Sequence, residues 1–299
     1  MKTTLDCIPC LARQAVAATR LAAADPNCRA QIMGEVLHWM ADMDLNQPPP
    51  ALSQITNRII RERSGNQDPY RLAKEEHNQL VLRMLPELRE MIAQSPDQLL
   101  LAVRLAIAGN VIDLGTSSEI AEGNVRAEIE QALAEPFVGD AESFRQAAAE
   151  ARRILYIADN AGEIAFDRLL IEQLGAERVT LVVRGGPIIN DATRSDAEMV
   201  GLQHVVEIID NGTDAPGTML ADCGPELRQR FGAADLIIAK GQGNFETLWE
   251  EQGNIYLLFK VKCPVIAEKV GLPLGTQVLL RNGTGLPEQD FGPAAGIDG

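Results

Sequence analysis

Residues 153–167 read RILYIADNAGEIAFD, and the rest of the fold is organised around this stretch. The run Ile154–Ala158 is apolar, with β-branched and aromatic members, which is typical of a buried strand. Ala161 and Gly162 are small enough for a sharp turn, and Glu163 opens an amphipathic segment. The stretch therefore predicts a strand, a tight turn and a helix over residues 163–174.

Asp159 and Asn160 fall between the predicted strand and the predicted helix. In open α/β sheets, ligands bind outside the carboxyl ends of the strands, and the positive end of a helix favours an anion. An acid beside an amide also suits a hard cation, because both side chains offer oxygen ligands. This turn therefore predicts both a metal site and a phosphate site.

Composition limits the class of partner. The chain has 299 residues, of which 46% are hydrophobic, so it can bury a substantial core in one large domain or two moderate ones. The formal net charge of −15 argues against nucleic acid as a partner, since nucleic-acid binders need a basic face. Small phosphorylated substrates are compatible with this charge, because a bound cation supplies positive charge locally.

The chain also carries signals about its compartment. We expect no signal peptide and no membrane span, because no basic region precedes an apolar run and no such run reaches roughly 20 residues. The five cysteines, an odd number, indicate a reduced, cytoplasmic protein. Cys7 and Cys10 form a CxxC pair that fits half a zinc site or a redox pair. No second CxxC exists, so we favour a reduced structural pair in the first helix.

Residues 1–140 predict an all-helical domain. Asp68 and Pro69 fit the N-cap and first position of a long helix, which Pro86 is expected to kink or divide. Asp97 is expected to cap the helix that follows it. Apolar spacings of three and four residues predict helices over 11–24 and 29–43, and further helices are expected over 51–63 and 121–134.

Residues 141–281 alternate strand-like runs with helices, which predicts an α/β fold, a three-layer α/β/α domain with a mostly parallel sheet. The expected helices cover residues 163–174, 195–200, 225–231 and 245–251. The expected strands are Ile154–Ala158, Val179–Val183, Val205–Ile209, Leu236–Ala239 and Ile255–Val261, with shorter runs at Pro264–Ala267 and Val278–Leu280. Residues 282–299 are rich in Gly and Pro and are expected to form a flexible tail.

Three polar turns follow predicted parallel strands, at residues 159–163, 184–193 and 240–246. Because the carboxyl ends of parallel strands meet at one edge of a sheet, we expect these turns to converge. A fourth polar stretch, residues 109–113, lies in the helical part. Each turn alone is also explained as a cap or a solvated loop. The joint pattern favours a site, because three such turns at strand ends are hard to explain as independent caps.

The side chains of these turns suggest a chemistry. Asp159, Asn160 and Asp191 offer two carboxylates and an amide, an oxygen-rich set for Mg²⁺ or Mn²⁺. Such an ion polarises a phosphoryl oxygen and lowers the pKa of a bound water. Lys240 is a compact positive charge in a glycine-rich turn. Three acids are unranked candidates for ordering the attacking water: Glu163, Asp196 and Glu246.

The ordered set of motifs resembles the damage-control phosphatases, formerly the domain-of-unknown-function 89 family. The CxxC at the start resembles the prokaryotic subfamily, and the resemblance extends from Cys7 to about Leu272. It implies a helical domain on a three-layer α/β domain, and metal-dependent release of phosphate from sugar phosphates, nucleotides or damaged cofactor precursors. The motifs are CIPC at 7–10, DPY at 68–70, GNVID at 109–113, DNAGE at 159–163, NDAT at 190–193 and KGQGNFE at 240–246.

The resemblance also implies site residues. Metal ligands for Mn²⁺, Mg²⁺, Co²⁺ or Ni²⁺ fall on Asp159, Asn160 and Asp191, and the phosphate-contacting lysine falls on Lys240. Asn110 matches an asparagine that the helical domain contributes. The predicted catalytic set is Asp159, Asn160, Glu163, Asp191 and Lys240. The predicted substrate-binding set is Asn110, Asp113, Thr193, Lys240, Gly241 and Asn244.

Two other functions remain open at the level of sequence. One branch of the family is described as an S-adenosylmethionine-dependent carboxyl methyltransferase, although this chain has no GxGxxG-like loop after a strand. A non-catalytic metal- and phosphometabolite-binding protein is the other. A covalent aspartyl-phosphate route through Asp159 is disfavoured, because Ala161 stands where a second acid is expected.

Overall fold

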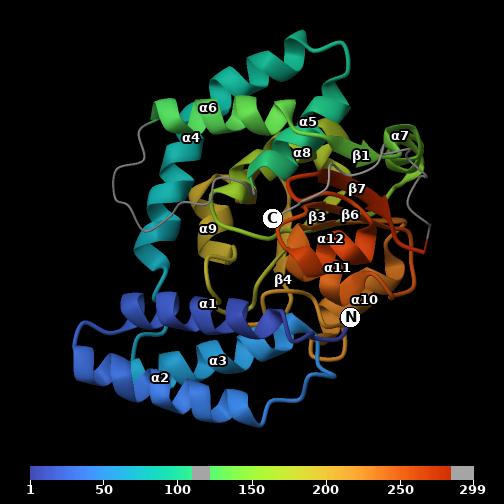
Figure 1. Cartoon of the computed structure of the whole chain (residues 1–299). Helices are drawn as coiled ribbons and strands as arrows, with labels where there is room; N and C mark the ends of the chain where they lie inside the picture. Colours follow the sequence, from blue (N-terminus) through green and yellow to red (C-terminus); the bar gives the residue numbers. More distant parts are fainter. Residues whose placement is uncertain (110–121, 284–299) are drawn as a thin grey trace, which may run out of the picture.

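The computed structural model describes residues 1–109 and 122–283. Its centre is a seven-stranded sheet in the order β1-β7-β6-β5-β2-β3-β4. Figure 1 shows this sheet surrounded by helices. Neighbouring strands are parallel, except that β6 and β7 pair antiparallel. The strands are β1 (Phe137–Gly139), β2 (Ile154–Ile157), β3 (Val179–Val183), β4 (Glu207–Asp210), β5 (Leu236–Lys240), β6 (Ile255–Lys260) and β7 (Gln277–Arg281).

Helices cover both faces of this sheet. Along β2, Ile154 and Tyr156 enter the core on one face, and Leu155 and Ile157 enter the core on the other, as a sheet buried on both sides requires. One face is covered by α4 (Arg71–Gln94), α5 (Gln98–Ala108), α6 (Glu122–Ala134), α7 (Ala141–Glu150), α8 (Glu163–Leu174) and α9 (Arg194–Met199). The other is covered by α10 (Pro225–Ala233), α11 (Gly241–Leu248) and α12 (Pro264–Val270). The prediction of a three-layer α/β fold with a mostly parallel sheet is confirmed.

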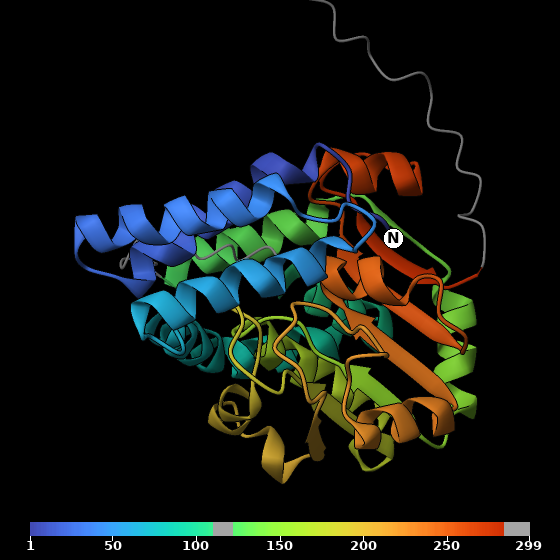
Figure 2. The ribbon, with the colours of Figure 1, turned by 90° about the horizontal axis from the view of Figure 1, so that it is seen from below.

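The first three helices, α1 (Cys7–Ala22), α2 (Pro26–Ala41) and α3 (Pro49–Ser64), have a hydrophobic cluster of their own and lie together (blue in Figures 1 and 2). The long α4 leads from them to α5 and α6, which share the core of the sheet. Polar contacts also tie α3 to the loop after β4, because Arg58 and Arg61 both pair with Asp214. Burial alone would raise the pKa of Asp214, but hydrogen bonds from Arg58, Gln54 and Arg61 hold it well below its usual range.

Three elements differ from the prediction. Residues 264–267 are the start of helix α12 and not a strand, because Pro264 takes the first helical position and the buried Ile266 and Val270 are four residues apart. Residues 137–139, placed in the helical domain but in no predicted helix, form β1, which is too short to show a period of two. The strand expected from Val205 begins only at Glu207, after a 3₁₀ turn.

Two prolines bear on the long predicted helix. Helix α4 begins at Arg71 and not at Pro69, and the Asp68 carboxylate accepts from the N–H of Tyr70 over 3.2 Å. Pro86 lies inside α4 without dividing it. All five cysteines are free thiols, and Cys10 is exposed. Across residues 1–109 and 122–283, no helix is long and apolar enough to cross a membrane.

Candidate functional site

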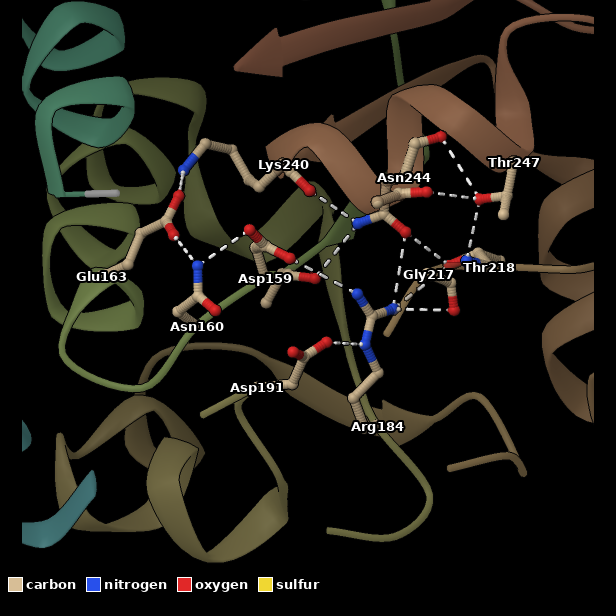
Figure 3. Close-up of polar contacts among 12 residues, drawn as sticks. Asp159, Asn160, Glu163, Arg184, Asp191, Gly217, Thr218, Lys240, Asn244 and Thr247 are labelled. Atoms are coloured by element: carbon tan, nitrogen blue, oxygen red, sulfur yellow. Dashed lines mark hydrogen bonds and ion pairs between the residues drawn. The ribbon is translucent and has the colours of Figure 1, made fainter. Parts of the chain in front are cut away.

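The turns after β2 and β3 are joined by backbone hydrogen bonds. Asn160 and Asp191 form an isolated antiparallel bridge, and the N–H of Ala192 donates to the carbonyl of Asp159 over 2.8 Å. The structure therefore brings Asp159, Asn160 and Asp191 together at the carboxyl edge of the sheet (Figure 3). Because the chain proceeds from β2 to β3 on one side and β5 lies on the other, this is a point where the strand order reverses, the usual place for a ligand.

Arg184 lies between the two acids of this set. It is the first residue after β3, and only 2% of it is exposed. Its Nε donates to Asp191 Oδ2 over 2.6 Å, and its Nη2 lies 3.6 Å from Asp159 Oδ1. Sequence reasoning assigned no role to Arg184. The available signal was a charged residue placed directly after the apolar run of β3.

Glu163, in the first turn of α8, contacts the Asp159–Asn160 pair. The Asn160 amide donates to Asp159 Oδ2 over 2.8 Å and to Glu163 Oε2 over 2.9 Å. The turn before α8 is fixed from α4, because Asn78 Oδ1 accepts from the N–H of Gly162 over 2.7 Å. Asn78 is another residue that sequence reasoning missed, since nothing local links it to this turn.

The other two acids considered for ordering water have different surroundings. Asp196 accepts from both the N–H and the hydroxyl of Thr193, and these contacts form the capping box of α9. It also accepts from Asn78 over 2.9 Å. Glu246 accepts from the amide of Gln242 over 2.9 Å. Among the three acids, in the described part of the chain, Glu163 is therefore the one that hydrogen-bonds to a predicted metal ligand, Asn160.

Lys240 is fully buried beneath the site, with no exposed surface. Its Nζ donates to Glu163 Oε1 over 2.6 Å, to Asp167 Oδ1 over 2.7 Å and to the carbonyl of Ala106 over 2.7 Å. Burial opposes the charged form, yet attraction to Asp167 and Glu163 raises the pKa of Lys240 above its ordinary value. An ammonium has three N–H groups, and all three are engaged. A phosphate contact would require Lys240 to give up one of these partners.

Helix α11 begins at Gly241, directly after β5 and earlier than the predicted start at residue 245. Gly241 has a φ of +80°, and a Cβ placed on it would lie 1.8 Å from Asp159 Oδ2. One turn later, the buried Asn244 accepts from Arg184 Nη1 over 3.4 Å and from the Thr218 hydroxyl over 2.8 Å. Gly241 therefore makes room for the Asp159 carboxylate, and Asn244 holds Arg184 from behind.

The remaining predicted residues are Asn110 and Asp113, which lie outside the described residues.

Negative charge exceeds positive charge in this cluster. Four carboxylates surround two cationic side chains, which leaves a formal charge of −2 when all six are ionised. Lys262 and Lys74 also lower the pKa of Asp159 and Asp191, respectively, but less than Arg184 does. Burial, then Glu163 and Asp191, raise the pKa of Asp159 well above its usual value. Burial also raises the pKa of Asp191 despite Arg184, and it raises that of Asp167 to about 6. The acids are Asp159, Glu163, Asp167 and Asp191, and the cations are Arg184 and Lys240.

A divalent cation fits this arrangement. It would offset the excess negative charge and would favour the ionised form of the crowded acids. Among residues 1–109 and 122–283, no three His, Cys, Asp or Glu side chains are grouped so that they alone hold a metal ion. The amide oxygen of Asn160 and oxygens of water or substrate would therefore complete the shell. Mg²⁺ usually binds in this way, through one or two carboxylates.

Replacing Glu246 by glutamine should flatten the pH dependence of stability. Burial raises the pKa of Glu246 to about 7, against 4.5 for an ordinary glutamate. The folded state therefore binds this proton more tightly than the unfolded state. The contribution of this proton to the free energy of unfolding is complete below about pH 4.5 and is lost as the pH rises through about 7. The change in the free energy of unfolding is up to about 3 kcal/mol.

Urea unfolding of the wild type and Glu246→Gln at pH values on both sides of this window measures the difference. Glutamine retains the acceptor oxygen for Gln242 but does not titrate. Identical slopes of stability against pH in the two proteins would contradict the prediction.

The fold and the site define a class of protein. It is a three-layer α/β protein with buried acids, an amide and two cations at the carboxyl edge of its sheet, where a metal ion and an anionic ligand are both compatible with the side chains. Residues 3–278 match the family model described as the damage-control phosphatase ARMT1-like domain. The chain belongs to this family, which confirms the resemblance found in the sequence.

Relatives of similar length support this assignment. A damage-control phosphatase of Pyrococcus horikoshii is 34% identical over 292 residues, which are 94% of this chain and 99% of the relative. A damage-control phosphatase of Archaeoglobus fulgidus is 31% identical over 285 residues, covering 93% and 98%. The crystal structure of a DUF89 family protein from Pyrococcus horikoshii matches with a TM-score of 0.85 at 33% identity, covering 94% of this chain and 99% of the other.

Proposed function

We propose that this protein is a metal-dependent phosphatase acting on small phosphorylated metabolites. Relatives named damage-control phosphatases match nearly the whole chain and support phosphatase chemistry. The observation that carries the metal dependence is the buried excess of negative charge around Asp159, Asn160 and Asp191. Sugar phosphates, nucleotides and damaged cofactor precursors are the proposed substrate classes.

The ligand residues and Arg184 have distinct roles in this proposal. Asp159, Asn160 and Asp191 would hold the ion, which when bound polarises a phosphoryl oxygen and lowers the pKa of a bound water. Arg184 keeps the two carboxylates apart and oriented, because it contacts both of them.

Two residues act from beneath the ligands. Glu163 orients Asn160 through their hydrogen bond, and Lys240 holds Glu163 in place. Lys240 is therefore proposed as a positioning residue, since its three N–H groups are all used within the protein. Such support matters because small displacements of catalytic groups cost activity.

A metal-supplemented phosphatase assay tests the proposal. The chain is dialysed against a chelator and assayed with p-nitrophenyl phosphate, alone and with Mn²⁺, Mg²⁺, Co²⁺ or Ni²⁺. We expect no turnover in the metal-free protein and restored turnover with at least one ion. The attack of water on the phosphorus atom is proposed to require the positive charge of the bound ion. The same assay on a panel of phosphorylated sugars, nucleotides and cofactor precursors identifies the substrate class.

Two outcomes would contradict the proposal. Full activity in the metal-free protein would refute the metal dependence. Tight binding of phosphosugars without turnover under any metal would refute the phosphatase and favour a binding protein.

A further inference from the structure

A cavity of about 450 Å³ opens at the amino edge of the sheet, opposite to the carboxyl edge that carries Asp159, Asn160 and Asp191. Residues that precede or begin β2, β3 and β4 line it, and Ala176, Val205 and Ala234 form an apolar wall that is only partly buried. Ile154 begins β2 and Asp159 follows the end of that strand. At about 3.3 Å per residue, the two sites are roughly 16 Å apart. The cavity is therefore distinct from the candidate phosphatase site.

Arginines are concentrated around this cavity. Four line it, against two glutamates, Glu177 and Glu207, in a chain whose net charge is −15. The segments before β2 and β3 and the helix α10 supply these arginines. They are Arg152, Arg153, Arg178 and Arg230.

Two of the arginines have no carboxylate partner among the described residues. Arg178 is held by backbone carbonyls, including that of Ala151 at 2.6 Å from Nη1, so its orientation is fixed while its charge is not neutralised by an acid. The guanidinium of Arg152 is exposed and has no hydrogen bond or ion pair within residues 1–109 and 122–283. A fixed cation and a free cation thus face one cavity.

The other two arginines are paired with acids at the rim. Arg153 lies 3.1 Å from Asp235, and Arg230 lies 2.5 Å from Glu207. Such exposed pairs are weak, and an incoming anion can compete for them. The cavity thus combines an apolar wall with a cationic rim, and its volume is in the range that accommodates drug-sized ligands.

We propose that this cavity binds a phosphate monoester of a planar ring system, with its phosphate on Arg152 and Arg178 and its ring on the apolar wall. A phosphate dianion can accept hydrogen bonds from two guanidinium groups at once. A carboxylate carries only one negative charge and is therefore a poorer partner for two arginines. The ring would cover the partly exposed Ala176, Val205 and Ala234. This inference concerns a second site and does not depend on the proposed phosphatase function.

Titration of the metal-free full chain with adenosine monophosphate, followed by ¹H–¹⁵N correlation spectra, tests the site. We expect saturable shifts of the amides at residues 152–155 and 178–180. Adenosine and inorganic phosphate, each carrying half of the ligand, should bind at least about tenfold more weakly than the monophosphate.

Matched charge reversals separate the cavity from general electrostatics. Arg152→Glu should weaken binding of the monophosphate by at least about tenfold without unfolding the protein, because this side chain has no partner to lose in the described structure. Arg13→Glu, at an exposed position of α1, should leave binding unchanged. Equal affinity in the two variants would overturn the proposal, as would shifts confined to residues 159–163 and 184–193. Tighter binding of nicotinate, a ring carboxylate, would overturn the preference for phosphate.

Discussion

Replacing Asp159 by alanine should abolish metal-dependent hydrolysis of p-nitrophenyl phosphate, lowering kcat by roughly 10³-fold or more. Asp159 follows the end of β2, beside Asn160 and 3.6 Å from Arg184, so its loss removes a central carboxylate of the proposed metal site. Isothermal titration with Mn²⁺ should show the affinity for the ion falling together with the activity. Asp42→Ala, at an exposed acid after α2, should leave both quantities unchanged.

The isosteric variant Asp159→Asn separates function from folding. It should be as inactive as the alanine variant, but its metal-free form should unfold at a temperature at or above that of the metal-free wild type. Burial and the neighbouring Glu163 and Asp191 disfavour the charge of Asp159, as its raised pKa indicates, and the amide removes this charge. Near-normal turnover and metal affinity in either variant would contradict the assignment of Asp159.

Gly241→Ala should lower kcat by about 10²-fold, although glycine has no side chain that could take part in the reaction. The added Cβ would lie 1.8 Å from Asp159 Oδ2 and 2.2 Å from its Cγ, so the carboxylate must move. The φ of +80° is also unfavourable for alanine, and we expect a loss of about 1–3 kcal/mol in the free energy of unfolding. Steady-state kinetics, Mn²⁺ titration and urea unfolding measure the three effects.

Gly232→Ala is the matched control for this change. Gly232 lies in α10, its added Cβ would meet nothing within 4 Å, and its φ is not in the left-handed region. Alanine there should leave kcat unchanged and stabilise the protein by up to about 1 kcal/mol, because alanine favours helix more than glycine does. Wild-type kcat and metal affinity in Gly241→Ala would show that Asp159 tolerates displacement and would remove Gly241 from the site.

Much of the α/β layer could be predicted from local patterns. The apolar runs that became β2, β3, β5 and β6 are buried on both faces, so each stands out as a continuous hydrophobic segment. Short elements could not be predicted in this way. β1 has three residues and exists through its pairing with β7, a contact between residues far apart in the chain. The run after Cys263 is apolar enough for a strand, and Pro264 at its start made it helix α12.

The site residues likewise fall into those that local patterns predict and those that they do not. From the sequence, Asp159, Asn160 and Asp191 can be placed after strands of one parallel sheet, and the geometry of such a sheet brings the ends of neighbouring strands together whatever the details of packing. The direction of Lys240 and the contacts of Arg184 follow from the folded arrangement of the whole chain. Lys240 lies beneath the site because a carbonyl of α5 and two acids of α8 accept its hydrogen bonds, and Arg184 contacts both Asp191 and Asn244. A buried charged side chain must point toward groups that can pair with it, because an unpaired buried charge is costly. For Lys240 and Arg184 these groups come from distant parts of the chain.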